Sequence, residues 1–267
     1  SSLNSQKVFF VDISRPAAPR VLGSMNLSLY PEDIALTPDG KYALVTGPPF
    51  SSLIASIHVP TRTLVGEFSV TSGTPSAVAV ARDGRTVLCA SFFSSSLHVL
   101  TIDPTNGQLA LRADIPATPM IMNVSISPDG RTALAIGFFG CDVLRIDAPG
   151  SVSRVGSLAL PDFSWGQSAA FTPKGDRAFL VGSVSMSNTY MVWEAMIQGP
   201  GQAVSTGTVI PLTGFFGYSA YFGVETMAVE PLGRYLFVSN RGEDELNRLA
   251  VVDLASASQA ESIDPAS

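Results

Sequence analysis

The sequence predicts an all-β protein, a β-propeller built from four-stranded blades. Three observations lead to this prediction. A short apolar run, a turn that is usually Pro-x-Gly, and a second β-rich run occur together five times, as expected of two strands joined by a tight turn. The turn glycines are 44, 46, 45 and 58 residues apart. Each period has room for about four strands, and a period near 45 residues is typical of propeller blades. The turn glycines are Gly40, Gly84, Gly130, Gly175 and Gly233.

The repeats run nearly from end to end, so residues 1–267 are predicted to form a single propeller domain. In the first repeat the inner strand pair spans 34–46, the third strand 53–59 and the fourth 64–70. An additional strand pair at 7–25 precedes this repeat and resembles the outer half of a blade. The predicted repeats cover about 31–74, 75–118, 119–164, 165–221 and 222–267.

Closure of the ring leaves two alternatives. Either the N-terminal pair and the C-terminal tail complete a sixth blade, or residues absent from the chain supply a seventh. An open ring would expose an apolar sheet face and an unpaired strand edge. Six blades are therefore predicted, with seven as the alternative.

Composition excludes several classes of protein. Hydrophobic residues make up 46% of the chain and charged residues 14%, which suits many buried strands. No apolar run approaches the roughly 20 residues needed to span a bilayer. The net charge is −6, and no basic stripe is present, so binding to nucleic acid or to an anionic membrane is not expected.

No metal or cofactor is predicted. Cys89 and Cys141 lie in different repeats and do not match a zinc-ligand spacing, so two unpaired thiols are expected, with a single disulfide as the alternative. His58 and His98 fall in third strands away from the axis, where packed or solvated residues are expected. No nucleophile elbow, phosphate-binding loop or calcium loop is present.

The second strands carry a family resemblance. Tyr42-Ala-Leu-Val-Thr46 and Tyr235-Leu-Phe-Val-Ser-Asn240, which follow such turns, resemble the YVTN-type repeats of bacterial surface-layer and lactonase-like β-propellers. The resemblance covers about 230 residues of the chain. It implies the propeller fold but not one function, because that superfamily includes enzymes, electron-transfer subunits and interaction modules.

The last repeat is similar to a stretch of 6-phosphogluconolactonase-like and muconate-cyclising propellers, in which the matching Glu and Arg line the central site. The resemblance implies that Glu225 and Arg241 are catalytic candidates. The Pro-Arg-His and Asn-Glu-Leu segments of those enzymes are replaced here by Trp165-Gly-Gln-Ser168 and Val181-Gly-Ser183. No histidine stands at a comparable point. The alternative role of Glu225 and Arg241 is an ion pair that ties two loops.

Residues just before a first strand and just after a second strand emerge on the same face of a propeller. Aromatic residues are frequent at these positions, and repeat four adds a long aromatic, glycine-hinged loop at 213–223. Packing between blades would explain one aromatic residue per loop. The additional aromatic residues favour a pocket that is lined by aromatic side chains and carries a few polar residues. The predicted ligand-binding residues are Phe92, Phe93, Asn123, Phe138, Phe139, Trp165, Gln167, Tyr221 and Asn240.

Two functions follow. The favoured one is a binding or interaction propeller that receives a small apolar or aromatic ligand, or a partner peptide. The alternative is a lactone hydrolase or cycloisomerase, with Glu225 as base or orienting carboxylate and Arg241 as a clamp on a substrate oxyanion. Few lysines and many Ser, Gly, Pro and Thr residues favour a secreted or periplasmic location over a cytoplasmic one.

Overall fold

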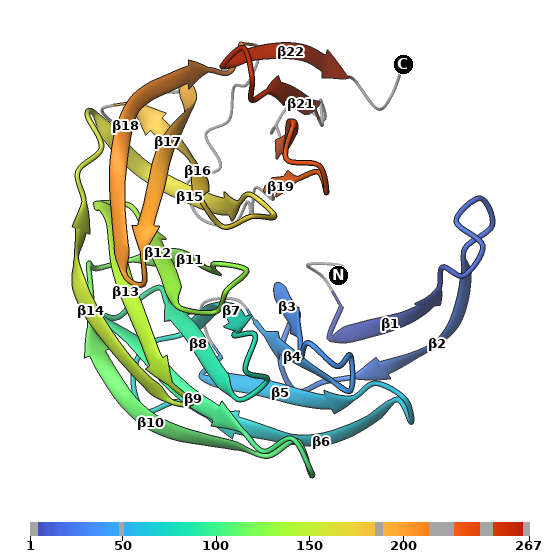
Figure 1. Ribbon diagram of the computed structural model, residues 1–267. Coiled ribbons are helices and arrows are strands. Elements are labelled where there is room, and N and C mark those ends of the chain that lie inside the picture. Colours follow the sequence, from blue (N-terminus) through green and yellow to red (C-terminus); the bar gives the residue numbers. More distant parts are fainter. Residues whose placement is uncertain (1–4, 48–50, 185–188, 214–226, 241–247, 264–267) are drawn as a thin grey trace.

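A computed structural model describes residues 5–47, 51–184, 189–213, 227–240 and 248–263. Within these ranges the chain forms 22 strands and no helix. The strands make five four-stranded antiparallel sheets and one two-stranded sheet. The all-β propeller of about six blades is therefore confirmed. Figure 1 shows the sheets following one another along an arc, with the first strands and the last sheet at its two ends.

The two-stranded sheet β1–β2 is called the N-terminal pair, and blades 1 to 5 are β3–β6, β7–β10, β11–β14, β15–β18 and β19–β22. The first ten strands are β1 (Lys7–Asp12), β2 (Arg20–Asn26), β3 (Asp33–Leu36), β4 (Tyr42–Thr46), β5 (Leu53–His58), β6 (Thr63–Ser69), β7 (Pro75–Val80), β8 (Thr86–Ser91), β9 (Ser96–Ile102) and β10 (Leu109–Pro116). The others are β11 (Ile121–Ile126), β12 (Thr132–Gly137), β13 (Gly140–Ala148), β14 (Ser151–Leu158), β15 (Phe163–Phe171), β16 (Arg177–Val184), β17 (Tyr190–Gly199), β18 (Gln202–Pro211), β19 (Met227–Val229), β20 (Tyr235–Asn240), β21 (Arg248–Asp253) and β22 (Ser258–Ile263).

Each blade is a simple meander in sequence order, which gives the propeller two different faces. The turns between first and second strands lie on one face, together with the turns between third and fourth strands; this is the hairpin face. Gly40 forms such a turn at φ 69°, a conformation that glycine adopts without strain. First strands begin and second strands end on the opposite face, called here the loop face.

The core lies between neighbouring blades. Every residue of β4, β8 and β12 is buried, because these strands are paired on both edges and covered on both sheet faces. Cys89 and Cys141 belong to this core as unpaired thiols, as the sequence indicated. Burial raises the pKa of both thiols, so neither is a reactive nucleophile.

The N-terminal pair packs against blade 1 through one face. Val8, Phe10 and Met25 lie against the cluster that contains Leu29 and Ile57. The opposite face presents apolar side chains to solvent, because residues alternate along a strand. Phe9, Val11 and Val21 are exposed on it, and Val11 pairs directly with Val21.

The expected pairing of the C-terminal tail with the N-terminal pair is not formed by the described strands. Ser258–Ile263 instead pairs with Arg248–Asp253 as the outer strand of blade 5. The tail is therefore used within its own blade. Among the described residues, no strand of blade 5 is hydrogen-bonded to the N-terminal pair.

Each blade also holds the segment that leads into its first strand. We call this contact the crossover clasp: a side chain of the third or fourth strand hydrogen-bonds a main-chain group of the incoming segment. The clasps are Glu67 Oε1 with Ser28 N at 2.8 Å, His98 Nε2 with Ser72 O at 2.9 Å, Asp142 Oδ2 with Thr118 N at 2.6 Å, Trp193 Nε1 with Pro161 O at 3.0 Å, and Gln259 Oε1 with Thr213 N at 2.8 Å.

Three of these side chains occupy one position of the repeat. His98, Asp142 and Trp193 are each paired with the residue that lies five positions after a turn glycine. All three are almost completely buried. A buried polar side chain without a partner is costly, and the imidazole, the carboxylate and the indole each find a partner in the main chain of the incoming segment.

The clasp of blade 3 is the most elaborate. Asp142 also accepts hydrogen bonds from Thr118 Oγ1, Arg154 Nη2 and Ser157 Oγ at 2.8 to 2.9 Å. Burial opposes ionisation of Asp142, but the bonds from Arg154 and Thr118 outweigh it and lower its pKa.

We predict that Asp142→Ala lowers the free energy of unfolding by about 2–4 kcal/mol, because it removes a buried carboxylate and leaves the half-buried Thr118 N–H and the Arg154 guanidinium without their acceptor. Urea denaturation at neutral pH measures this loss. Asp147→Ala is the matched control: Asp147 pairs with Arg145 at 3.0 Å, and both side chains are about half exposed, so its stability should stay close to wild type. Equal stability of the two variants would contradict a structural role for the clasp.

Candidate functional site

The loop face carries a continuous run of aromatic rings across three blades. Phe93 contacts Phe92 with ring centroids 4.7 Å apart, Phe92 contacts Phe138 at 5.8 Å, and Phe138 contacts Trp165 at 5.4 Å. We call these residues, with the adjacent Phe139, the aromatic run. Phe92 and Phe93 follow β8, Phe138 and Phe139 follow β12, and Trp165 lies at the start of β15. The structure thus brings four of the sequence-predicted aromatic residues into direct contact.

The members of the aromatic run differ in exposure. Phe92 is only 4% exposed and packs inside the propeller, whereas Phe93 is 58% and Phe139 67% exposed. Packing between blades accounts for Phe92, but not for two phenylalanines that stand in solvent. Exposed apolar side chains that gather on one face are typical of binding surfaces.

Main-chain hydrogen bonds hold the aromatic run in place. Phe138 N donates to Met120 O at 3.3 Å, and Trp165 N donates to Phe138 O at 3.0 Å. Met120 and Trp165 both have positive φ, at 59° and 46°, and each lies ten positions before a turn glycine. Residues other than glycine seldom adopt this conformation, and such strain is concentrated at functional sites.

The first strands are irregular at the same end of the blades. β7 has a register shift between Pro75 and Ala77, β11 between Ile121 and Asn123, and β15 between Ser164 and Ser168. Bulges of this kind redirect side chains and are frequent beside active sites.

The polar residues predicted here are only partly accessible. Asn123 is half-buried at the shift in β11, and Gln167 is buried at the shift in β15. Ser76, within the shift in β7, donates from Oγ to Ile121 O of the next blade at 3.1 Å. This bond joins two neighbouring first strands at the loop face.

Two carboxyl groups at the start of β3 were not predicted from the sequence. Asp33 accepts hydrogen bonds from its neighbour Ile34 N at 2.8 Å and from Val78 N of blade 2 at 2.9 Å, so it joins two blades. Glu32 is its neighbour. The sequence did contain a signal for Glu32. It lies eight residues before the turn glycine Gly40, just as Glu225 lies eight residues before the turn glycine Gly233.

Both carboxyl groups have raised pKa values. Burial raises the pKa of Glu32 to about 7, and the charge of Asp33 adds to the effect. Burial also raises the pKa of Asp33, against its backbone hydrogen bonds. Glu32 and Asp33 line a cavity of about 300 Å³ between β1 and β3, with Lys7, Phe9 and Val45 among the other lining residues. A carboxyl group that changes its charge near neutral pH can act as an acid or a base.

Several predicted site residues lie outside the described part of the chain. These are Glu225, Arg241 and Tyr221. Asn240 ends β20, but its side chain is likewise not described. The pairing of Glu225 with Arg241 and their place in a central site therefore stay predictions.

The described residues offer no metal centre. In the five described ranges, no group of three His, Cys, Asp or Glu side chains is arranged to hold a metal ion. None of the described elements is a helix with the length and apolar character needed to cross a membrane.

Comparison with solved structures identifies the fold. A functionally unknown protein from Desulfotomaculum acetoxidans matches with a TM-score of 0.82 at 14% identity, over 98% of this chain and 80% of that one. A periplasmic gluconolactonase from Pseudomonas aeruginosa matches with a TM-score of 0.72 at 16% identity, over 92% of this chain and 74% of that one. The chain has the fold of the lactonase-like β-propellers.

Proteins with other functions share this fold. Hydrazine synthase from Kuenenia stuttgartiensis matches with a TM-score of 0.73 at 24% identity, over 95% of this chain and 72% of that one. No protein-family model and no curated protein matches the sequence. At these identities the likeness shows the fold alone, and it does not decide between a binding role and an enzymatic one.

We predict that Glu32 makes the protein less stable as the pH rises from about 4.5 to about 7. A carboxyl with a raised pKa in the folded state binds its proton more tightly there than in the unfolded chain. Its stabilising effect is therefore complete below the unfolded pKa and is lost as the pH rises through the folded pKa. The loss is up to about 3 kcal/mol, at about 1.4 kcal/mol per pKa unit.

Urea denaturation across this pH interval measures the effect. In Glu32→Gln the free energy of unfolding should fall less steeply with pH than in wild type. Glu261→Gln, which removes an exposed carboxylate on β22, should leave this pH dependence as in wild type. An unchanged slope in Glu32→Gln would show that Glu32 titrates normally in the folded protein.

Proposed function

We propose that this protein is a binding propeller whose loop face receives a small apolar or aromatic ligand, or the aromatic side chains of a partner peptide. The observation that carries the proposal is the aromatic run, in which rings from three blades touch and two phenylalanines remain exposed. Aromatic side chains bury a large area at low entropic cost and prefer edge-to-face contacts with other rings.

The surroundings of the aromatic run support a built site. A main-chain bond from Trp165 N to Phe138 O joins blades 3 and 4, and the side-chain bond from Ser76 Oγ to Ile121 O joins blades 2 and 3. The loops that carry Phe93 and Phe139 therefore belong to blades that are linked at the loop face. A site that is already ordered loses less conformational entropy when a ligand binds. A secreted or periplasmic setting belongs to the proposal as well and rests on composition.

An enzymatic function of the lactone hydrolase or cycloisomerase type is the second candidate, and Glu32 favours it. Its pKa of about 7 suits a general acid or base, and it occupies the repeat position that Glu225 occupies in the last blade. Turnover of a lactone that is lost in Glu32→Gln but retained in Phe93→Ala would support the enzyme over the binding propeller.

We predict that Phe93→Ala and Phe139→Ala each weaken binding of aromatic ligands by about 1–2 kcal/mol, or roughly 5- to 30-fold in Kd. A thermal-shift screen of aromatic and apolar compounds identifies ligands, and calorimetric titration measures their affinity. Leu232→Ala is the control, since Leu232 is 90% exposed on the opposite, hairpin face and its removal should change nothing.

Two outcomes would count against a small-molecule site. Ligands that bind both variants as tightly as wild type do not use the aromatic run. If no compound of the screen shifts the melting temperature, a protein-binding platform is the better account of the exposed phenylalanines.

A further inference from the structure

A groove lies on the hairpin face, away from the aromatic run. It is a groove of about 550 Å³ beside the turn that joins β9 to β10, and we call it the outer groove. Its volume falls within the range of small-molecule sites. Its walls include Arg85, Asp103, Pro104, Gln108, Arg112 and Pro149, which come from blade 2 and the next blade's outer turn.

Two guanidinium groups line the outer groove. Arg112 donates from Nε to Thr101 Oγ1 at 2.8 Å, which fixes the orientation of its planar group. In the described part of the chain, neither Arg85 nor Arg112 has a carboxylate within salt-bridge distance, whereas Arg145, Arg154, Arg177 and Arg234 each do. Planar guanidinium groups bind carboxylate and phosphate oxygens in a two-point geometry.

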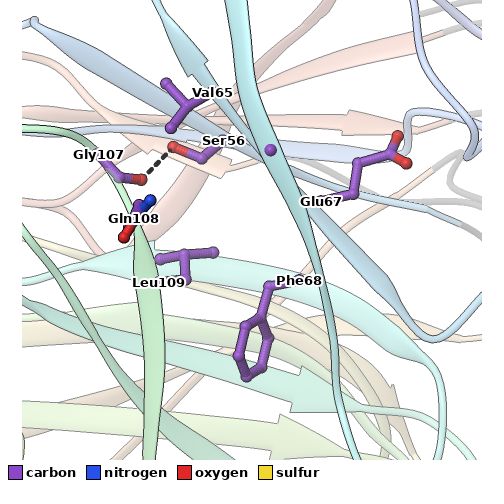
Figure 2. Close-up of a pocket in the computed structure, with 8 residues that line it drawn as sticks. Ser56, Val65, Glu67, Phe68, Gly107, Gln108 and Leu109 are labelled. Atoms are coloured by element: carbon purple, nitrogen blue, oxygen red, sulfur yellow. Dashed lines mark hydrogen bonds between the residues drawn. The ribbon is translucent and has the colours of Figure 1, made fainter.

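The turn at one side of the groove is held rigidly. Figure 2 shows Ser56 bonded to Gly107, with Gln108 and Leu109 following; the Ser56 Oγ to Gly107 O distance is 2.7 Å. Lys41 Nζ donates to Pro104 O at 3.1 Å, and Gly107 N donates to Asp103 O at 2.7 Å.

Glycine is required at the centre of this turn. Gly107 has φ 74°, and a Cβ there would lie 2.4 Å from the Tyr42 ring. Ser56 and Gly107 also border a smaller cavity of about 230 Å³ on the other side of the turn, which shares Gln108 and Leu109 with the outer groove. The turn therefore separates the smaller cavity from the outer groove, and its ordered main chain lines both.

Polar groups other than the arginines are also available to a ligand. Asp103 is exposed, and a hydrogen bond from the Thr105 side chain is the main reason for its lowered pKa, with a smaller contribution from the charge of Arg85. The carboxylate of Asp103 can accept hydrogen bonds from ligand hydroxyls, and the amide of Gln108 can donate or accept. The rings of Pro104 and Pro149 supply apolar walls.

We propose that the outer groove binds a small organic anion that carries hydroxyl groups, the chemical class of sugar acids and sugar phosphates. Arg85 and Arg112 bind the anionic group. Asp103 and Gln108 bind hydroxyls, and the proline rings pack against the carbon skeleton. The site does not depend on the function proposed for the loop face.

Calorimetric titration of the full chain at low ionic strength tests the proposal with four probes: galacturonate, glucose 6-phosphate, inorganic phosphate and glucose. One of the two sugar anions should bind at least about tenfold more tightly than either phosphate or glucose. Tighter binding of galacturonate identifies a carboxylate ligand, and tighter binding of glucose 6-phosphate a phosphate ligand; either supports the proposal.

Matched variants locate the site. Arg85→Gln and Arg112→Gln should each weaken binding of the sugar anion about tenfold or more, while Arg131→Gln should not. Arg131 is exposed and follows the turn glycine of blade 3, as Arg85 follows that of blade 2. Its substitution changes the net charge by the same amount. Equal weakening by all three variants, absence of binding by both sugar anions, or an affinity for phosphate or glucose equal to that of the tighter-binding sugar anion would overturn the proposal.

Discussion

The structure depends on attaching each crossing segment to the blade that it enters. A blade can bury its strands on both faces only if the segment that crosses from one blade to the next also satisfies its main-chain groups. The crossover clasps meet this need with a side chain from the third or fourth strand, and the three third-strand side chains are buried. Trp193 serves blade 4 and Asp142 serves blade 3, so the geometry recurs although the chemistry differs.

Because each clasp fixes the segment before a first strand, the loop face is rigid where the strands begin. The register shifts in β7, β11 and β15 and the positive φ values of Met120 and Trp165 all lie at this end. Blades that are firmly attached elsewhere can sustain this local strain. The aromatic run stands on that strained and cross-linked edge, whereas the hairpin face consists of short regular turns.

The likeness to lactonase-like propellers fixes the scaffold but leaves its chemistry open. The same arrangement of blades can present aromatic rings, carboxyl groups or guanidinium groups, because loops and turns vary while the strand pairing does not. In this chain the described loop face is aromatic, a carboxyl pair lies at the start of β3, and two guanidinium groups line a groove on the opposite face. Function must therefore be tested at each of these places separately.

The sequence by itself determined the propeller, the four strands of each blade and the aromatic loops, because the period near 45 residues and the alternation of apolar residues are local properties of the chain. It also placed Phe92 and Phe138 on one face. It did not reveal that Phe92 is buried while Phe93 is exposed, that Ser258–Ile263 belongs to blade 5, or that Glu32 has a raised pKa. Burial of Phe92 and of Glu32 arises from contacts between residues far apart in the sequence, and the choice of a partner strand for Ser258–Ile263 depends on how the last blade is completed. Only the tertiary structure decides burial, pairing and the electrostatic surroundings of a group.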